Sequence, residues 1–470
     1  MNSTNKLARQ PVGPLLLSMS LPACTGLLVI TLYTVIDIIF VGHFAGSLAL
    51  AGLSITLPVQ TLISTLGMAI GIGSGCLLSA AFGAQRLAWA QQIFGNALSL
   101  AVTVSLVAMV VGLLLTDLIL YFFGGRSEFL TYARRYYRIV ILGSPLLSLW
   151  MCLGCIMRAE GSSRSTMKIM IVAAGLNVGL DALFMIEFGW GVEGAAWATV
   201  ISQMVALLAS LCFFLVKGRS ALRVIPGHLI WRCNIVVKIA MLGGSTLMRQ
   251  VLGCLMVVAL NYNLYHYGDG VAVAVYGILN RLFSLLYVPM LGLNQGFLPI
   301  AGYNYGAGQH HRVRQSLNLA LMSACVVNVV LVAVVELFSH ELVELFTQDD
   351  RIITTGSHAI EIMVLLMPLL PLQILGGGYF QSVGKPRYAF LFIFSRHALL
   401  LIPLIFALPY WFGLSRIWFA FPISDGVLSL LVLLFLARER LSIKQNGAVA
   451  VGEPGGFHER EKICQENVRD

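Results

Sequence analysis

Long apolar stretches separated by short polar segments make up most of this chain of 470 residues. Each stretch has about 20 residues or more, which lets a helix cross a bilayer core of about 30 Å. The pattern predicts an all-α membrane protein with twelve transmembrane helices, over residues 13–41, 50–80, 92–122, 132–157, 167–187, 192–216, 236–265, 271–300, 313–338, 357–382, 388–412 and 415–437.

The second half of the chain repeats the first at an offset of 223 residues, and proline and glycine positions mark the repeat. The matching pairs are Pro145 and Pro368, Gly154 and Gly377, Gly161 and Gly384, Gly83 and Gly306, and Gly73 and Gly296. Because six spans return the chain to its starting side, both copies should have the same orientation. The repeat therefore predicts two pseudo-symmetric six-helix bundles related by an axis along the membrane normal, which could rock to give alternating access.

Polar segments set the expected domain boundaries. The longest basic segment between spans, 217–234, lies between the copies and is expected to be a cytoplasmic linker. It would join an N-terminal bundle, 1–216, to a C-terminal bundle, 235–437. The remaining polar residues, 438–470, are expected to form a disordered cytoplasmic tail.

Composition and charge agree with a membrane protein. The chain is 58% hydrophobic and only 11% charged, with a net charge of +9. If the N-terminus is cytoplasmic, that side holds 21 of the 30 Lys and Arg residues, and the opposite side holds six. This is the positive-inside pattern, so both termini are expected in the cytoplasm. The basic excess reflects topology and does not indicate nucleic-acid binding.

Two acids lie in apolar sequence of the first half without a basic residue nearby. A charged side chain at such a depth costs roughly 2.5–3.5 kcal/mol, which makes Asp37 and Asp181 functional candidates. Asn177 lies four residues before Asp181, so the two share one helix face. Burial and mutual repulsion favour the protonated carboxylates, which suits proton uptake and release. With Thr199 supplying a hydroxyl, the same groups could instead bind Na⁺, and a plain capping or water-facing role for Asp37 is also open.

The second copy does not repeat these acids. At the offset of 223 residues, leucine replaces Asp37, Asn177 and Asp181, at positions 260, 400 and 404. The spans of this half carry Arg249, Arg281 and Arg396 instead. Asp425 and Arg281 lie at a similar depth, which predicts an ion pair of structural character between them.

Five short segments make the chain similar to a known family. They are VIDIIFVG at 35–42, RAEG at 158–161, LNVGLD at 176–181, GVEGAAWAT at 191–199 and QSVGKP at 381–386. In order and spacing, they resemble those of the multidrug and toxic compound extrusion (MATE) transporters over nearly all of residues 10–440. The resemblance implies two parallel six-helix bundles that export amphipathic, often cationic, compounds in exchange for H⁺ or Na⁺.

The resemblance also assigns roles to residues. It implies a cation site of Asp37, Asn177, Asp181 and Thr199, with bending of the first span at Pro22 as the coupling step. Glu160 matches a position where family members carry a functionally sensitive acid, although a loop acid that balances Arg158 and Arg164 is an equal interpretation.

Three side chains are the candidates for the wall of a substrate cavity. The resemblance suggests Tyr136 and Tyr137, and the adaptable side chain of Met170 is a further candidate. Some relatives place a cation-binding acid in the seventh span, whereas residues 239–260 of this chain contain no Asp or Glu. The chain therefore resembles the branch that couples through its first half.

The alternative functions belong to different classes of protein. A lipid-linked oligosaccharide flippase of the same superfamily remains open because of the three arginines in the second half. A membrane enzyme would need a nucleophile and a base together, and His397 has no such partner. We expect a transporter with no catalytic residues, no metal and no cofactor beyond the coupling ion, monomeric and multi-pass in a bacterial inner membrane. Small-molecule drugs and the lipid bilayer are its expected partners, and nucleic acid is not.

Overall fold

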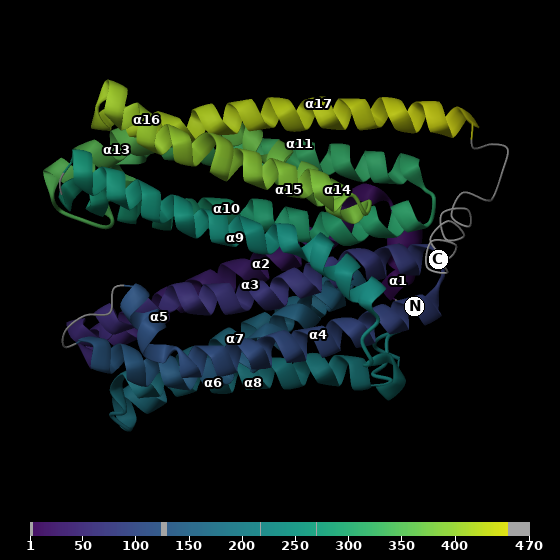
Figure 1. Ribbon diagram of the computed structural model, residues 1–470, viewed down its shortest axis with the longest axis horizontal. Helices are drawn as coiled ribbons and strands as arrows, with labels where there is room; N and C mark the ends of the chain where they lie inside the picture. The colour runs from purple at the N-terminus through teal and green to yellow at the C-terminus, as the bar shows by residue number, and fades with distance from the viewer. Residues whose placement is uncertain (1–2, 124–128, 217, 269, 450–470) are drawn as a thin grey trace, which may run out of the picture.

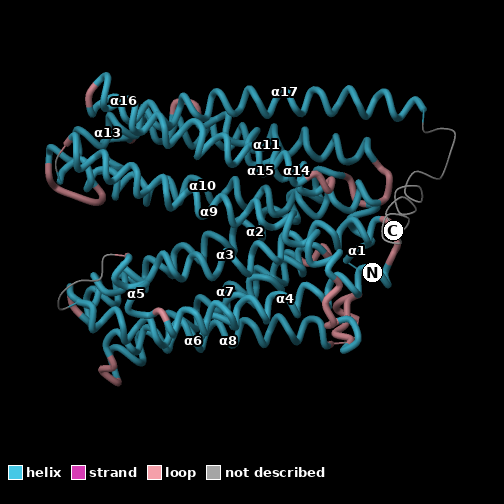
Figure 2. The backbone as a smooth tube through the Cα atoms, viewed as in Figure 1, coloured by secondary structure: helices cyan, strands magenta, loops and turns pink. Residues whose placement is uncertain are grey.

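The computed structural model describes residues 3–123, 129–216, 218–268 and 270–449. Within these ranges the chain forms helices joined by short loops and turns, with no strand (Figure 2). The first half comprises α1 (Ser3–Arg9), α2 (Val12–Phe40), η1 (Val41–Ala45), α3 (Ser47–Gly83), α4 (Leu87–Leu114), α5 (Thr116–Phe122), α6 (Phe129–Ala159), α7 (Ser163–Ala182), η2 (Leu183–Glu187) and α8 (Gly191–Leu215).

The second half begins after a short 3-10 turn, η3 (Pro226–His228). Its helices are α9 (Cys233–Tyr267), α10 (Gly270–Gly306), α11 (His310–Leu337), α12 (Ser339–Glu344), α13 (Asp350–Val364), η4 (Met367–Leu369), α14 (Leu370–Ser382), α15 (Pro386–Phe394), η5 (Ser395–Leu401), α16 (Ile402–Phe412), η6 (Leu414–Phe419) and α17 (Ala420–Val449). The elements η1, η2 and η5 are π-helical.

The prediction of an all-helical membrane protein is confirmed. In the described residues, eleven helices are long and apolar enough to cross a membrane, or up to twelve if the bent α6 counts as one span. The two parts of α6, 129–142 and 144–159, meet at 50°. Pro145 explains this bend, because a proline inside a helix removes one backbone hydrogen bond and clashes with the preceding turn. Its counterpart, Pro368, lies in η4, which interrupts the tenth span.

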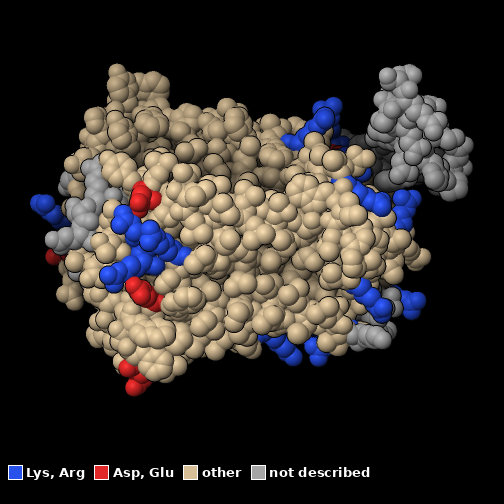
Figure 3. Space-filling view, turned by 60° about the horizontal axis from the view of Figure 1, so that its bottom comes forward, with Lys and Arg blue, Asp and Glu red and all other residues tan. Residues whose placement is uncertain are grey.

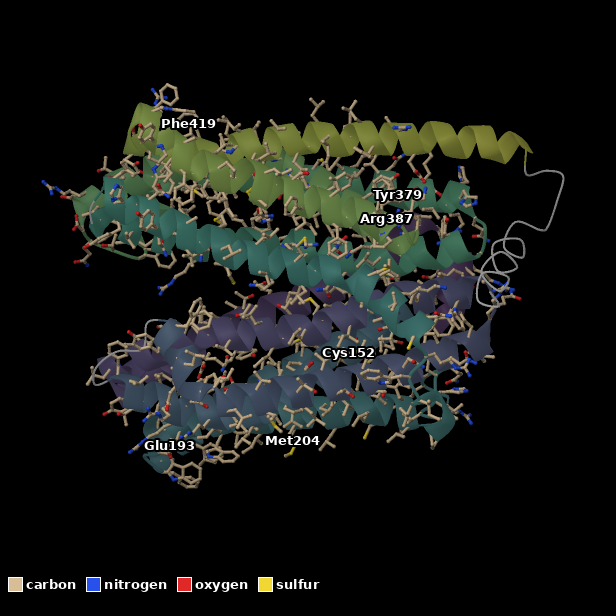
Figure 4. All side chains as sticks on the ribbon, in the orientation of Figure 1. Cys152, Glu193, Met204, Tyr379, Arg387 and Phe419 are labelled. Carbon is tan, nitrogen blue, oxygen red and sulfur yellow. The ribbon has the colours of Figure 1, made fainter. Side chains whose placement is uncertain are left out.

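The helices form two layers, with α2 to α8 in one and α9 to α17 in the other (Figure 1). Glu193 of α8 and Phe419 of η6 lie at the same end of the molecule, opposite the end where α1 begins (Figure 4). The expected linker range, 217–234, contains the connection between α8 and α9. The last helix, α17, continues beyond residue 437 to Val449, and residues 450–470 of the expected tail lie outside the described residues.

Glycines on repeated positions allow the two layers to approach each other closely. A Cβ atom on Gly83 of α3 would lie 2.0 Å from the carbonyl oxygen of Tyr303. A Cβ atom on Gly306 of α10 would lie 2.0 Å from the carbonyl oxygen of Ala80. The two contacts are equivalent at the offset of 223 residues, so they lie on either side of the pseudo-twofold axis. Only glycine permits this backbone-to-backbone distance.

A second pair of contacts repeats the arrangement further along α3 and α10. The Cβ position of Gly73 lies 2.2 Å from the carbonyl oxygen of Ile239 in α9. The Cβ position of Gly296 lies 2.2 Å from the hydroxyl oxygen of Ser20 in α2. Helices α2 and α3 of the first bundle therefore pack against α9 and α10 of the second, and the glycines recognised in the repeat form this interface.

The interface lies toward the end of the molecule where α1 begins and α17 ends (Figure 1). Arg312 of α11 reinforces it there, because its guanidinium donates to the carbonyl oxygens of Gln10 at 2.7 Å and Leu7 at 3.4 Å, and to Asn304 Oδ1 at 2.9 Å. Toward the opposite end the two layers diverge (Figure 1). The bundles are thus joined at one end of the membrane span.

One face of the molecule shows how charged side chains are distributed along it (Figure 3). On the face shown in Figure 3, a broad belt without charged residues separates the Lys and Arg residues of one end from a mixed cluster of basic and acidic residues at the other. An uncharged belt is what a lipid-facing surface requires, because charge in the hydrocarbon region is costly.

We expect Gly83→Ala and Gly306→Ala each to weaken the packing between the bundles. The neighbouring atom is a backbone oxygen that cannot rotate away, so the helices must separate, which costs about 1–3 kcal/mol in overpacked sites. Thermal unfolding in detergent would show a lowered midpoint for both variants. The control is Gly277→Ala in α10, where a Cβ meets nothing within 4 Å. That change should be neutral or stabilising, and equal midpoints for all three variants would contradict the packing role.

Candidate functional site

Four candidate residues of the first half come together inside the bundle. Asp37 lies near the C-terminal end of α2, Asn177 and Asp181 lie one turn apart on α7, and Thr199 lies on α8. All four side chains are buried, with exposed fractions of 6%, 1%, 0% and 7% respectively. Asn177 Nδ2 lies 3.5 Å from Thr199 Oγ1, within the limit of a weak hydrogen bond. The two carboxylates lie within electrostatic range of each other.

The oxygen atoms of this polar cluster are largely unpartnered. Among the described residues, no hydrogen bond reaches Asp37 Oδ1, Asn177 Oδ1 or either carboxylate oxygen of Asp181. No ion pair in the same part of the chain involves either acid. A buried acceptor without a partner costs about 1–3 kcal/mol, and a buried unpaired charge costs more. The cluster is therefore suited to take up a proton or a cation that supplies the missing partner.

A π-helical turn begins within four residues after each acid. The α-helical geometry of α2 ends at Phe40 and η1 begins at Val41, four residues after Asp37. Helix α7 ends at Ala182 and η2 begins at Leu183, two residues after Asp181. Such turns widen a helix locally and occur frequently at functional sites. The hydrophobic pattern of the sequence does not predict these π-helical turns.

Tyr136 of α6 lies beside the polar cluster. Its buried hydroxyl accepts a hydrogen bond from Gln60 Nε2 at 3.1 Å. The ring lies within electrostatic range of both acids and within hydrogen-bonding reach of Thr199. The structure therefore brings Tyr136 to the four candidate residues, and it adds Gln60, which sequence reasoning did not single out.

The other candidates of the first half lie apart from this cluster. Tyr137 is buried and donates to the carbonyl oxygen of Gly112 at 3.3 Å. Met170 packs its sulfur against Gly26 of α2. Pro22 lies inside α2, which continues through it as one helix from Val12 to Phe40.

Glu160 lies in the loop between α6 and α7 and contacts the segment that joins the bundles. Its side chain is 1% exposed. Ser220 Oγ lies 2.8 Å from both carboxylate oxygens, and the Ala221 N–H donates to Oε1 at 3.2 Å. Burial raises the pKa of Glu160 to about 7, although these hydrogen bonds act in the opposite direction. Glu160 is thus an anchor for the inter-bundle segment.

The second half contains a cavity of about 460 Å³, lined by residues of α9, α10, α13, η4, α14, α15, η5 and α17. The expected ion pair between Asp425 and Arg281 is wrong, because Arg396 Nε donates to Asp425 Oδ1 at 2.8 Å. Depth along a span does not fix the direction of a side chain. Arg396 lies on η5, which packs against α17, whereas Arg281 is exposed on α10. Tyr136, Tyr137 and Met170 do not line this cavity.

Up to twelve candidate membrane-spanning helices in the described residues, with a buried polar site in the first bundle, define a polytopic membrane protein. The family model described as MatE matches the chain twice, over residues 22–183 and 246–407. The chain belongs to the MatE family, and it is a transporter and not an enzyme. The two matches correspond to the two copies of the repeat.

Named relatives and solved structures agree with this membership. The chain is 27% identical over 437 residues to the multidrug export protein MepA of Staphylococcus aureus, a match that covers 93% of this chain and 96% of the relative. MepA of Staphylococcus saprophyticus is 25% identical, with 90% and 94% covered. A crystal structure of a MATE protein in a bent conformation shares the fold, with a TM-score of 0.90 at 23% identity and coverage of 95% and 99%. An outward-facing multidrug resistance MATE transporter gives a TM-score of 0.88 at 24% identity, with 93% and 97% covered.

The raised pKa of Glu160 predicts a pH-dependent stability. Between pH 4.5 and about 7 the folded protein holds the proton whereas the unfolded chain has lost it. Stability should therefore fall as pH rises through this window, by up to about 1.4 kcal/mol for each pH unit, and should level off above pH 7. Glu160→Gln should remove this slope from thermal unfolding curves recorded between pH 5 and 8.

The control for this measurement is Glu193→Gln, because Glu193 has an exposed side chain that forms a 3.6 Å surface ion pair with Arg135. The Glu193 variant should keep the slope of the unmodified protein. Identical slopes in the protein with and without the Glu160 change would show that this carboxyl group does not titrate in the window.

Proposed function

We propose that this chain exports organic drugs from the cell, as an antiporter that exchanges them for H⁺ or Na⁺ by alternating access. Membership of the MatE family and likeness to multidrug export proteins over 93% of the chain support export of drugs. The observation that carries the exchange mechanism is the buried cluster of Asp37, Asn177, Asp181 and Thr199. Its unpartnered oxygens among the described residues are Asp37 Oδ1, Asn177 Oδ1 and both carboxylate oxygens of Asp181. A proton or a Na⁺ ion would supply those partners in one state of the cycle and leave in the other.

The coupling step would begin at this cluster. Asp37 is on α2, which packs both against α7 of its own bundle and against α10 of the other bundle. A cation bound between α2 and α7 would draw their polar faces together. Movement of α2 would then change its contact with α10, and Pro22 offers a position where the helix could bend because one backbone hydrogen bond is missing.

The orientation follows from the basic residues. Most Lys and Arg residues lie on the side that carries the N-terminus, which supports a cytoplasmic location for both termini. The bundles are packed together toward that end through Gly83 and Gly306. The structure would then represent a state closed to the cytoplasm in a bacterial cell membrane, and Staphylococcus relatives are consistent with such a membrane.

A flippase for lipid-linked oligosaccharides is the second candidate function. Three arginines in the spans of the second half favoured it in the sequence. One of them, Arg396, is neutralised by Asp425, and the similar proteins are named for multidrug export. We therefore favour drug export.

Asp37→Asn and Asp181→Asn should each reduce efflux of a fluorescent organic cation from cells by about tenfold or more. An amide keeps the shape of the side chain but can neither release a proton nor offer a charge-assisted contact, which is worth roughly this factor. The control is Asp117→Asn, which removes an exposed carboxylate paired with Arg134 at 2.8 Å. Unchanged efflux in both site variants, at normal expression, would remove the mechanism proposed here.

Membrane vesicles should separate the two coupling ions. A pH gradient or a Na⁺ gradient, imposed one at a time, is expected to drive uptake of the same dye in only one case, and Asp37→Asn should abolish that uptake. Dye movement that responds to neither gradient would rule out antiport with these ions while leaving membership of the family unaffected.

A further inference from the structure

The cavity of the second half has an excess of positive charge. Arg249 and Arg396 line it, and Asp425 is the carboxylate in its wall. The 2.8 Å bond between Arg396 and Asp425 neutralises one guanidinium. Arg396 also donates to the hydroxyl of Tyr287 at 3.2 Å, which fixes its orientation. One formal positive charge, that of Arg249, is left over.

Arg249 has no counterion in the described part of the chain. None of the ion pairs or hydrogen bonds found there involves its guanidinium, and the like charge of Arg396, in the wall of the same cavity, acts on it. A cationic side chain inside a membrane bundle is expensive and usually pairs with a partner or marks a ligand pathway. The planar guanidinium group matches a carboxylate in a bidentate geometry, which a lysine could not offer.

Polar groups and apolar surface surround this charge. Gln250 of α9 and Asn280 of α10 line the same cavity as Arg249. The remaining wall is largely apolar, with Met256, Phe283 and Phe392 among its members. A volume of about 460 Å³ is within the range of sites for small organic ligands, roughly 300–1,000 Å³. The chemistry is that of a pocket for an apolar body with one negatively charged group.

We propose that this cavity binds the carboxylate of an amphipathic organic anion, with Arg249 as the residue that pairs with it. The proposal builds on the proposed export function and extends its substrates beyond organic cations. The two halves then have opposite preferences: the first binds the coupling cation at Asp37 and Asp181, and the second binds an anionic group.

Binding to the purified full-length protein tests this proposal directly. The probes are a fluorescent anthracene carboxylate and its neutral carboxamide, which share one aromatic body and differ in charge. The unmodified protein should bind the carboxylate more tightly than the carboxamide. Arg249→Gln should weaken carboxylate binding by about tenfold or more, the value of one charge-assisted contact, and should leave carboxamide binding unchanged. Arg249→Lys should keep part of the preference because it keeps the charge.

The matched control is Arg281→Gln, which removes an exposed arginine from α10 that does not line the cavity. It should bind both probes as the unmodified protein does. The proposal is overturned if the unmodified protein binds the two probes equally, a result that needs no variant to fold. It is also overturned if Arg249→Gln and Arg281→Gln give the same carboxylate affinity. Neither result bears on efflux of organic cations, so the export function is tested separately.

Discussion

The close approach of two helix pairs at a few glycines is the constraint on which the rest of this structure depends. At Gly83 and Gly306 the backbones of α3 and α10 come so near that a single methyl group would overlap a carbonyl oxygen. Without a hydrophobic driving force between helices in lipid, such packing is a main source of cohesion. Because the contacts lie toward one end of the bundles, the halves are joined there and are free to differ in separation elsewhere. This geometry is what a rocking transporter requires.

Packing at that end leaves the polar groups in the rest of the molecule as the candidates for function. Helices α2 and α7 hold the two acids inside the first bundle, where both are buried and Asp37 Oδ1 and both carboxylate oxygens of Asp181 have no hydrogen-bond partner among the described residues. The π-helical turns after Asp37 and Asp181 interrupt the regular hydrogen bonding close to those acids. In the second bundle the only π-helical segment among the described residues is η5, which carries Arg396 beside the cavity. In both halves a π-helical segment lies close to charged groups. The π-helical segments of the two halves are not at equivalent positions of the 223-residue repeat.

Sequence reasoning predicted much of this architecture. Runs of apolar residues long enough to span a bilayer gave the helices, and the 223-residue offset identified the glycines that later proved to form the interface. The shared helix face of Asn177 and Asp181 was predictable because residues four apart lie on one side of a helix, and the importance of Asp181 because charge is rare inside membranes. The place of Thr199, on the next helix, was suggested by the family resemblance. The partner of Asp425 was not predictable, since hydropathy fixes the depth of Arg281 and Arg396 but not the direction in which either side chain points.

The sequence by itself determined the class of the protein, its duplicated plan and the acids that make the first half different from the second. These properties depend on composition, spacing and periodicity, which can be measured along the chain without knowledge of how it folds. Only the tertiary structure decided that the bundles meet toward one end and that Glu160 holds the segment between them. It also decided that Arg249 lines a cavity with no counterion among the described residues. These features depend on which side chains from distant spans face one another. Helix packing determines that arrangement, and the pattern of residues along the chain does not contain the packing contacts.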